Sequence, residues 1–293
     1  MSQAVPDASP GARAARRLID RLVACSSPAR ELLDLALSES DGPGRDASGR
    51  RMCALTPTGA PFEASFSVGC SASDASTAVR FSAVAGARHP FFVSRLRVQG
   101  AVLLDAGRFL PAPAASTWAS LTGPLLDAAF PDPARVPART RLVGALGAAL
   151  DPADGSLLGL RCYLNAGAVP GTCARLDAGF EPLARSLEAE GWPAHLVAIE
   201  VRRDGSVGRR LYAEARLDHG AARPAVCERL ASAGLPATLL DAPVFVALAE
   251  NGETTVHVPA SVFVSCGIEP SSAVYRLADA VGAAGVLARW QDA

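Results

Sequence analysis

The sequence predicts an α+β fold, in which repeated helix and hairpin units form a closed antiparallel β-barrel with an outer ring of helices. Hydrophobic periods of 3.6 and 2 residues alternate along the chain, so helices alternate with pairs of strands. Short turns within these pairs make the strands antiparallel neighbours. The pattern also recurs: Tyr163 and Tyr212 are 49 residues apart, and Tyr212 and His257 are 45 apart, as in repeat architectures.

The N-terminal 48 residues are predicted to be helices that pack outside the barrel. Residues 12–25 repeat apolar side chains at helical spacing. A second helix begins at Ser27, where a capping residue precedes a proline at the first helical position, and ends at Leu37. The Gly/Asp/Ser-rich residues 38–51 then form a loop before the first strand.

The remaining elements alternate as the repeat requires, although residues 90–109 are ambiguous. Predicted strands cover residues 52–55, 62–68, 77–85, 141–150, 157–165, 195–202, 207–217, 244–249 and 254–258. Predicted helices cover residues 117–130, 173–190, 223–233 and 272–290. A single domain, residues 1–293, accommodates all these elements, and closure of the barrel removes exposed sheet edges.

The composition excludes several classes of protein. Hydrophobic residues make up 49% of the chain and charged residues 19%, so a large core can form. The net charge of −1 provides no broad basic surface, so we expect neither nucleic acid nor a membrane as a partner. All 28 basic residues are arginine, which excludes a P-loop lysine or a Schiff-base lysine.

Cysteine usage and the N-terminal residues predict a cytoplasmic location. The seven cysteines are odd in number and contain no Cys-x-x-Cys motif, so we expect neither a disulfide framework nor a structural zinc site. We see no apolar segment typical of a signal peptide. The aspartates of residues 151–154 and 203–205 are turn residues, and we expect no metal site.

One face of the predicted strands is polar. Helices need an apolar surface, so the apolar set of each strand faces the helices and the polar set faces solvent or a wet lumen. An open sheet with a solvated face gives the same alternation. Two of the three tyrosines, however, occupy the third position of Arg-x-Tyr on successive hairpins, which favours a lumen. Guanidinium groups suit a diphosphate, and aromatic faces can shield a carbocation.

Several of these segments resemble ABBA-type aromatic prenyltransferases, in which repeated α-β-β-α units form a ten-stranded barrel, the PT barrel. The branch that the chain most resembles contains dimethylallyltryptophan synthase and the cyanobactin-type peptide enzymes. The matching segments are Leu55-Thr-Pro-Thr-Gly-Ala-Pro-Phe-Glu-Ala-Ser-Phe66, Val79-Arg-Phe-Ser82, Arg161-Cys-Tyr-Leu164 and Arg210-Leu-Tyr212. Thr255-Val-His-Val-Pro259 departs from that family's Lys-x-Tyr-x-Pro strand by having threonine and histidine.

The resemblance implies a role for each of seven residues. Glu63 would take a proton from the acceptor. The residues that would bind the diphosphate are Arg80, Arg161 and Arg210, and those that would shield the cation are Tyr163, Tyr212 and His257. No cofactor would be obligatory, and Mg2+ would at most assist the binding of the diphosphate.

The predicted reaction transfers a dimethylallyl or longer isoprenyl group, from dimethylallyl or geranyl diphosphate, to an electron-rich acceptor. The compact chain favours a side chain of a ribosomal peptide natural product (a RiPP) as that acceptor. A free indole or phenol is the alternative within the same class. A non-catalytic barrel that binds a peptide or a hydrophobic ligand is the alternative from another class.

Overall fold

The computed structural model describes residues 17, 27–40, 62–65, 78–137, 140, 142–151, 154–165, 176, 178–217, 223–258 and 260–280. Its strands form one eight-stranded antiparallel sheet, in which each strand pairs with its neighbours in sequence. They are β1 (Phe62–Ser65), β2 (Val79–Ala83), β3 (Gly144–Leu150), β4 (Leu157–Asn165), β5 (Ala194–Arg202), β6 (Val207–Ala215), β7 (Val244–Ala249) and β8 (Thr254–His257).

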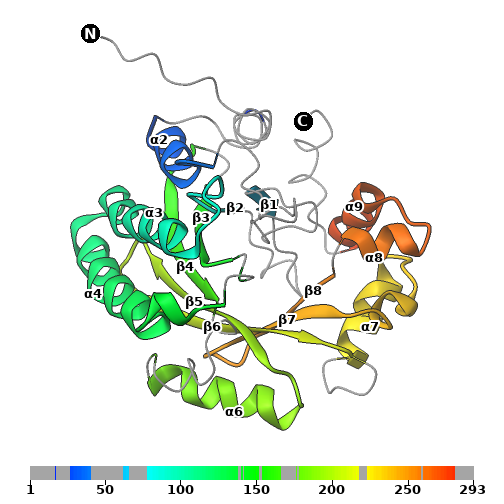
Figure 1. The fold of residues 1–293 in the computed structure, drawn as a ribbon. Helices are drawn as coiled ribbons and strands as arrows, with labels where there is room; N and C mark the ends of the chain where they lie inside the picture. The colour runs from blue at the N-terminus through cyan, green and yellow to red at the C-terminus, as the bar shows by residue number, and fades with distance from the viewer. Residues whose placement is uncertain are drawn as a thin grey trace.

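Helices cover one face of this sheet. Figure 1 shows the sheet as a curl, with α3, α4 and α6 along its outer side. The α-helices are α2 (Ser27–Ala36), α3 (Phe92–Ala106), α4 (Ala112–Ala129), α6 (Glu181–Ala189), α7 (Arg223–Ser232), α8 (Ala260–Ser265) and α9 (Pro270–Ala280). Short 3-10 helices are η1 (Gly107–Phe109), η2 (Pro133–Arg135), η4 (Ala178–Phe180) and η5 (Ala237–Leu240).

The predicted closed barrel is wrong for the part of the chain that the structure describes. The strand pairings run in order from β1 to β8 and none joins these two end strands, so the sheet is a half-barrel. Both end strands have only four residues. Closing a barrel requires the first and last strands to form a staggered set of backbone hydrogen bonds with each other. Strands of four residues can form few such bonds. The described strands also number eight, against the ten of the resembling family.

Most predicted elements coincide with observed ones. The last three predicted hairpins match the pairs β3–β4, β5–β6 and β7–β8. The ambiguous residues 90–109 form α3 and η1. The short helix α8 occupies residues for which no element was predicted. The predicted strand 52–55, the helix 12–25 apart from residue 17, and residues 281–290 lie outside the described residues.

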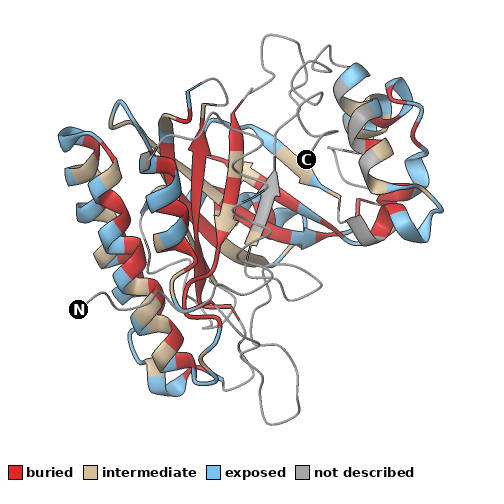
Figure 2. Ribbon diagram, turned by 90° about the horizontal axis from the view of Figure 1, so that it is seen from above, coloured by how far each residue is buried: buried red, intermediate tan, exposed pale blue. Residues whose placement is uncertain are grey.

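The main core lies between the helices and the apolar face of the sheet. Alternate residues of β4, Leu160, Cys162 and Leu164, are at most 1% exposed and pack into one cluster with α2, α3, α4 and α6. A second cluster joins the ends of β6 and β7 to α7, α8 and α9. Figure 2 shows the buried residues concentrated where helices face strands. The period-2 pattern of the strands therefore determines which face the helices cover.

Trp118 connects the two long helices of the outer layer. Its side chain lies in α4 and is fully buried, and its Nε1 donates a hydrogen bond of 2.6 Å to the carbonyl oxygen of Leu103 in α3. Leu103 belongs to the last turn of α3, where helical carbonyls lose their intrahelical partners. A Cβ built on Gly107 would lie 2.8 Å from Cδ1 of Trp118. Gly107 therefore permits the close approach of this indole ring.

Substitution of Trp118 tests this contact. Trp118→Phe is expected to lower the free energy of unfolding by about 1–3 kcal/mol, because it leaves the Leu103 carbonyl without this buried donor. Trp118→Ala is expected to cost about 3–5 kcal/mol, because a cavity also forms. Urea unfolding followed by circular dichroism measures both values. A Trp118→Phe protein as stable as the wild type would show that the hydrogen bond has no net effect.

Candidate active site

The sheet register places the predicted polar residues on one face. Arg161 of β4 is paired with Gly147 of β3 and with Glu200 of β5. Tyr163, two residues further along β4, is paired with Ala198, which is paired in turn with Arg210 of β6. Residues opposite one another in an antiparallel pair point to the same side. We call this side, opposite the helices, the inner face.

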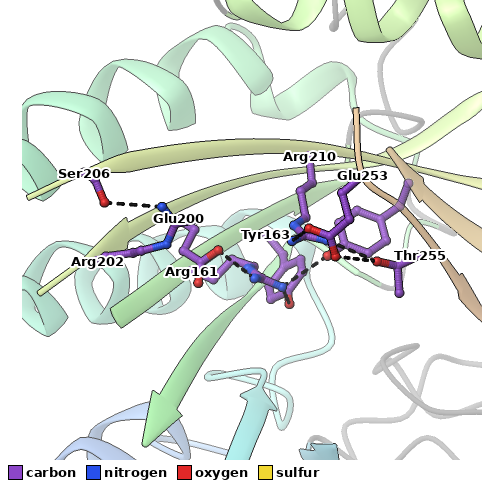
Figure 3. A network of polar contacts seen from close by, with 9 residues as sticks. Arg161, Tyr163, Glu200, Arg202, Ser206, Arg210, Glu253 and Thr255 are labelled. Carbon is purple, nitrogen blue, oxygen red and sulfur yellow. Dashed lines mark hydrogen bonds and ion pairs between the residues drawn. The ribbon is translucent and has the colours of Figure 1, made fainter. Parts of the chain in front are cut away.

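Arg161 is the centre of a polar cluster on the inner face. Its Nη1 donates to the hydroxyl oxygens of Tyr163, at 3.1 Å, and Tyr212, at 3.4 Å. Its Nη2 donates to Oε2 of Glu200 at 2.8 Å, and both side chains of this ion pair are only 13% exposed. Figure 3 shows the guanidinium between Tyr163 and Glu200. One side chain therefore ties β4 to β5 and β6.

Aromatic rings form a row across three even-numbered strands. The ring centroids of Tyr163 and Tyr212 are 5.7 Å apart, and those of Tyr212 and His257 are 5.8 Å apart. The guanidinium of Arg161 lies 5.7 Å from the centroid of the Tyr163 ring. The structure thus brings together all three residues predicted to shield a cation, since the hairpin repeat places them at equivalent positions.

The other two predicted arginines lie on the same face. Arg210 donates to Oγ1 of Thr255 at 3.2 Å and forms an ion pair of 3.0 Å with Glu253. Arg80 of β2 is paired with Ala149 of β3. Burial lowers the pKa of Arg80, and the positive charges of Arg161 and Arg210 lower it further. Arg80 therefore lies close enough to Arg161 and Arg210 to be repelled by both.

Small residues on β3 and β7 leave space for these large side chains. The inner-face residues of β3 are Ala145, Gly147 and Ala149, and β7 has Ala247 and Ala249. A Cβ built on Gly147 would lie 2.8 Å from Cε2 of Tyr163. Gly147 is therefore needed for the Tyr163 ring to lie across β3. Ala198 and Ala247 pack against the ring of Tyr212 and are fully buried there.

The charges of the central cluster are well defined at neutral pH. Burial alone would raise the pKa of Glu200, but the guanidinium of Arg161 keeps it below its ordinary value, assisted by Arg202 and Arg80. Burial and the adjacent Tyr163 raise the pKa of Tyr212, so its hydroxyl stays protonated. Glu200 is therefore an anion, and Tyr212 can donate a hydrogen bond.

His257 is neutral at neutral pH. Burial of the imidazole disfavours its charged form, and the positive charges of Arg161 and Arg210 disfavour it further. Together these effects lower the pKa of His257 to about 4. The residue is also exposed to solvent, so water screens part of this effect. Its ring thus extends the aromatic row as an uncharged group.

Glu63, the predicted base, is described only through its backbone. It lies in β1 and is paired with Ser82 of β2, next to the pair formed by Ser65 and Arg80. A strand was predicted at these residues, and the catalytic role of Glu63 stays a prediction. Glu200 was not among the predicted site residues. Glu200 and Arg202 alternate with the apolar residues Ile199 and Val201 in β5, the first strand of the β5–β6 hairpin.

The described residues contain neither a metal-binding cluster nor a membrane-spanning helix. These residues contain no group of three or more His, Cys, Asp or Glu side chains arranged to hold a metal ion. Within the same part of the chain, no helix combines the length and the apolar character needed to cross a membrane.

The fold and the inner face define an ABBA-type aromatic prenyltransferase fold. The chain is similar to a 5-dimethylallyltryptophan synthase from Streptomyces coelicolor, with a TM-score of 0.52 and 18% identity over 94% of this chain and 89% of that one. It is similar to the prenyltransferase PriB, with a TM-score of 0.51 and 18% identity over 94% and 87% of the two chains.

AnaPT from Neosartorya fischeri is a third solved structure with this fold. Its TM-score is 0.51, and its identity is 13% over 96% of this chain and 82% of that one. No family model and no curated protein matches the sequence. At these identities the likeness establishes a shared fold, and the activity has to be argued from the residues of the inner face.

A double-mutant cycle tests whether Arg161 and Glu200 are energetically coupled. Arg161→Gln and Glu200→Gln are each expected to lower the free energy of unfolding by about 3 kcal/mol, since each leaves a buried charge unpaired. The double variant should lose less than their sum, with a coupling energy of about 1–3 kcal/mol. The exposed pair Arg108 and Asp105 is the control, for which urea unfolding should give a smaller coupling energy. Strict additivity at Arg161 and Glu200 would contradict the ion pair.

The lowered pKa of His257 predicts a pH dependence of stability. The unfolded chain binds a proton at this histidine near pH 6.5, whereas the folded protein resists protonation until about pH 4. The free energy of unfolding should therefore fall as the pH falls between these values. His257→Phe is expected to lose less stability than the wild type when urea unfolding is compared at pH 7 and pH 4.5. An equal loss in both proteins would refute the shift.

Proposed function

We propose that this protein is a prenyltransferase that moves a dimethylallyl or longer isoprenyl group from its diphosphate to an electron-rich aromatic acceptor. The observation that carries the proposal is the cluster in which Arg161 donates to both Tyr163 and Tyr212 and lies close to Arg80. It combines cations that bind a diphosphate with aromatic faces that stabilise a carbocation. The solved prenyltransferases of the same fold support it.

The proposed reaction begins with ionisation of the donor. The bond between C1 of the isoprenyl group and the diphosphate oxygen breaks, and its electron pair leaves with the diphosphate. Arg80, Arg161 and Arg210 would stabilise the negative charge that develops on that oxygen. The row of Tyr163, Tyr212 and His257 would face the allyl cation, and a neutral His257 adds no repulsive charge to it.

A ring carbon or heteroatom of the acceptor then attacks the cation. A new bond forms to the isoprenyl group, and the acceptor loses a proton to restore its aromaticity or neutrality. Glu63 would accept this proton as an ionised carboxylate. We propose no obligatory cofactor, with Mg2+ at most assisting the binding of the diphosphate.

The acceptor that we propose is an indole, either free or within a peptide. The predicted preference for a ribosomal peptide rested on the compact length of the chain. The match covers 89% of a 5-dimethylallyltryptophan synthase, so length does not separate a peptide from a free amino acid. A RiPP side chain therefore stays one of two acceptors to test, beside a free indole. A phenol remains within the same reaction class.

Binding of an unreactive donor analogue tests the diphosphate site. The wild type should bind the thiolo analogue of dimethylallyl diphosphate with micromolar affinity, and Arg161→Ala should weaken binding at least tenfold, about 1.4 kcal/mol. Arg209→Ala is the matched control, because Arg209 adjoins Arg210 in β6 but is paired with Ile199 on the helix side and bonds Glu250. Isothermal titration calorimetry of folded variants gives the affinities. No binding by the wild type, to this analogue or to its geranyl homologue, would refute the proposed function and favour a non-catalytic binding protein.

Glu63→Gln tests the proposed base. Prenyl transfer to tryptophan or to a tryptophan-containing peptide, followed by mass spectrometry, should fall at least a hundredfold, because a general base typically contributes about 10²–10⁴-fold. Binding of the donor analogue should be unchanged. Glu214→Gln, at an exposed glutamate of β6, is the control and should keep its activity. Full activity in Glu63→Gln would remove Glu63 from the mechanism.

A further inference from the structure

Glu200 is a carboxylate at the centre of the cations that we propose for diphosphate binding. It lies across from Arg161 in the β4–β5 ladder and accepts a hydrogen bond from Nη2 of that residue at 2.8 Å. Arg202, two residues along β5 on the same face, also stabilises its charge, as does Arg80. Glu200 therefore occupies the kind of position that an anionic substrate needs.

The donors of Arg161 show that Glu200 and a diphosphate compete. Nη1 of Arg161 already bonds the hydroxyl oxygens of Tyr163 and Tyr212. Arginine binds an anion most strongly through two parallel N–H groups, one on each of two nitrogens. With Nη1 engaged by the phenols, such a contact has to use Nη2, and Glu200 bonds Nη2. Nη2 has two N–H groups, but a diphosphate that bonds it lies beside the Glu200 carboxylate, and the two negative charges repel strongly because the Arg161 and Glu200 side chains are only 13% exposed.

The structure also offers Glu200 a second position. Its neighbour on β6 is Gly208, and a Cβ built there would lie 3.9 Å from Oε2 of Glu200 and 3.6 Å from Nη2 of Arg202. No side chain of residue 208 therefore stands between the carboxylate and Arg202. Figure 3 shows Arg202 beside Glu200, on the side away from Tyr163. If the Glu200 side chain rotates toward Arg202, its carboxylate exchanges Arg161 for Arg202 as its cationic partner.

We infer that Glu200 is an exchangeable counter-ion of the diphosphate site. It holds Arg161 in the free protein, yields Arg161 to the diphosphate of the donor, and returns to Arg161 when the diphosphate product leaves. Glu200 is thus a positioning residue that limits affinity for the product and preserves the direction of the guanidinium between turnovers. The inference rests on the proposed function, since it takes the anion bound by Arg161 to be a diphosphate.

Titration with inorganic diphosphate tests this role without requiring activity. Glu200→Gln in the full chain is expected to bind inorganic diphosphate about tenfold more tightly than the wild type, because a competing charge is removed. The matched control is Glu250→Gln, whose carboxylate pairs with Arg209 at 3.1 Å on the helix side, and its affinity should be unchanged. In steady-state prenyl transfer, Glu200→Gln should also show a lower inhibition constant for inorganic diphosphate.

The outcomes separate the failure of this inference from that of the proposed function. Equal or weaker binding of inorganic diphosphate by Glu200→Gln, with normal binding by the wild type, would overturn the counter-ion role and leave the proposed function standing. No binding by either protein would overturn both. If Glu200→Gln does not fold, Glu200→Asp keeps the charge but shortens its reach by one methylene. It should bind about threefold more tightly than the wild type, and unchanged affinity would overturn the inference.

Discussion

The inner face depends on one interaction, the buried guanidinium of Arg161 held between two phenols and a carboxylate. A charge this far from water needs a partner, and Glu200 provides it from the adjacent strand. Tyr163 and Tyr212 accept the remaining hydrogen bonds of Nη1. The positions of the two aromatic rings follow from that pairing. The residue that we propose for binding the diphosphate therefore also aligns the two rings that we propose to face the cation.

The distribution of side-chain size makes this arrangement possible. Large inner-face residues occupy β4 and β6, whereas β3 has only alanine and glycine opposite them and β7 has alanine opposite Arg210 and Tyr212. Each arginine or tyrosine can therefore lie flat over a neighbouring strand, as Tyr163 does over Gly147. On the other face the same strands are mostly apolar and meet the helices, with Arg209 of β6 as a charged exception. One set of strands thus serves a polar site and a hydrophobic core with no shared residues.

Period-2 alternation was enough to predict that Arg161, Tyr163 and Tyr212 share one face of the sheet, because a strand with one buried face has only one possible orientation. The helix at residues 92–106 was ambiguous for a physical reason. Its buried side includes Arg95 and Gln99, each 1% exposed, which interrupt the apolar period. Both bond backbone groups of other segments: Arg95 donates to the carbonyl of Thr140, and Gln99 accepts from the amide of Ala85. Closure of the barrel depends on how far the end strands extend, which local patterns do not encode.

Each strand of this sheet pairs only with its neighbours along the chain, so a hairpin and its helix form a separable unit. Addition or removal of such a unit at β1 or β8 leaves every other pairing unchanged, as in repeat proteins. The circumference of the curl can therefore change over evolution in steps of one hairpin. The space that the curl encloses changes with each such step, while Arg161 and Tyr212 keep their positions on the central strands β4 and β6.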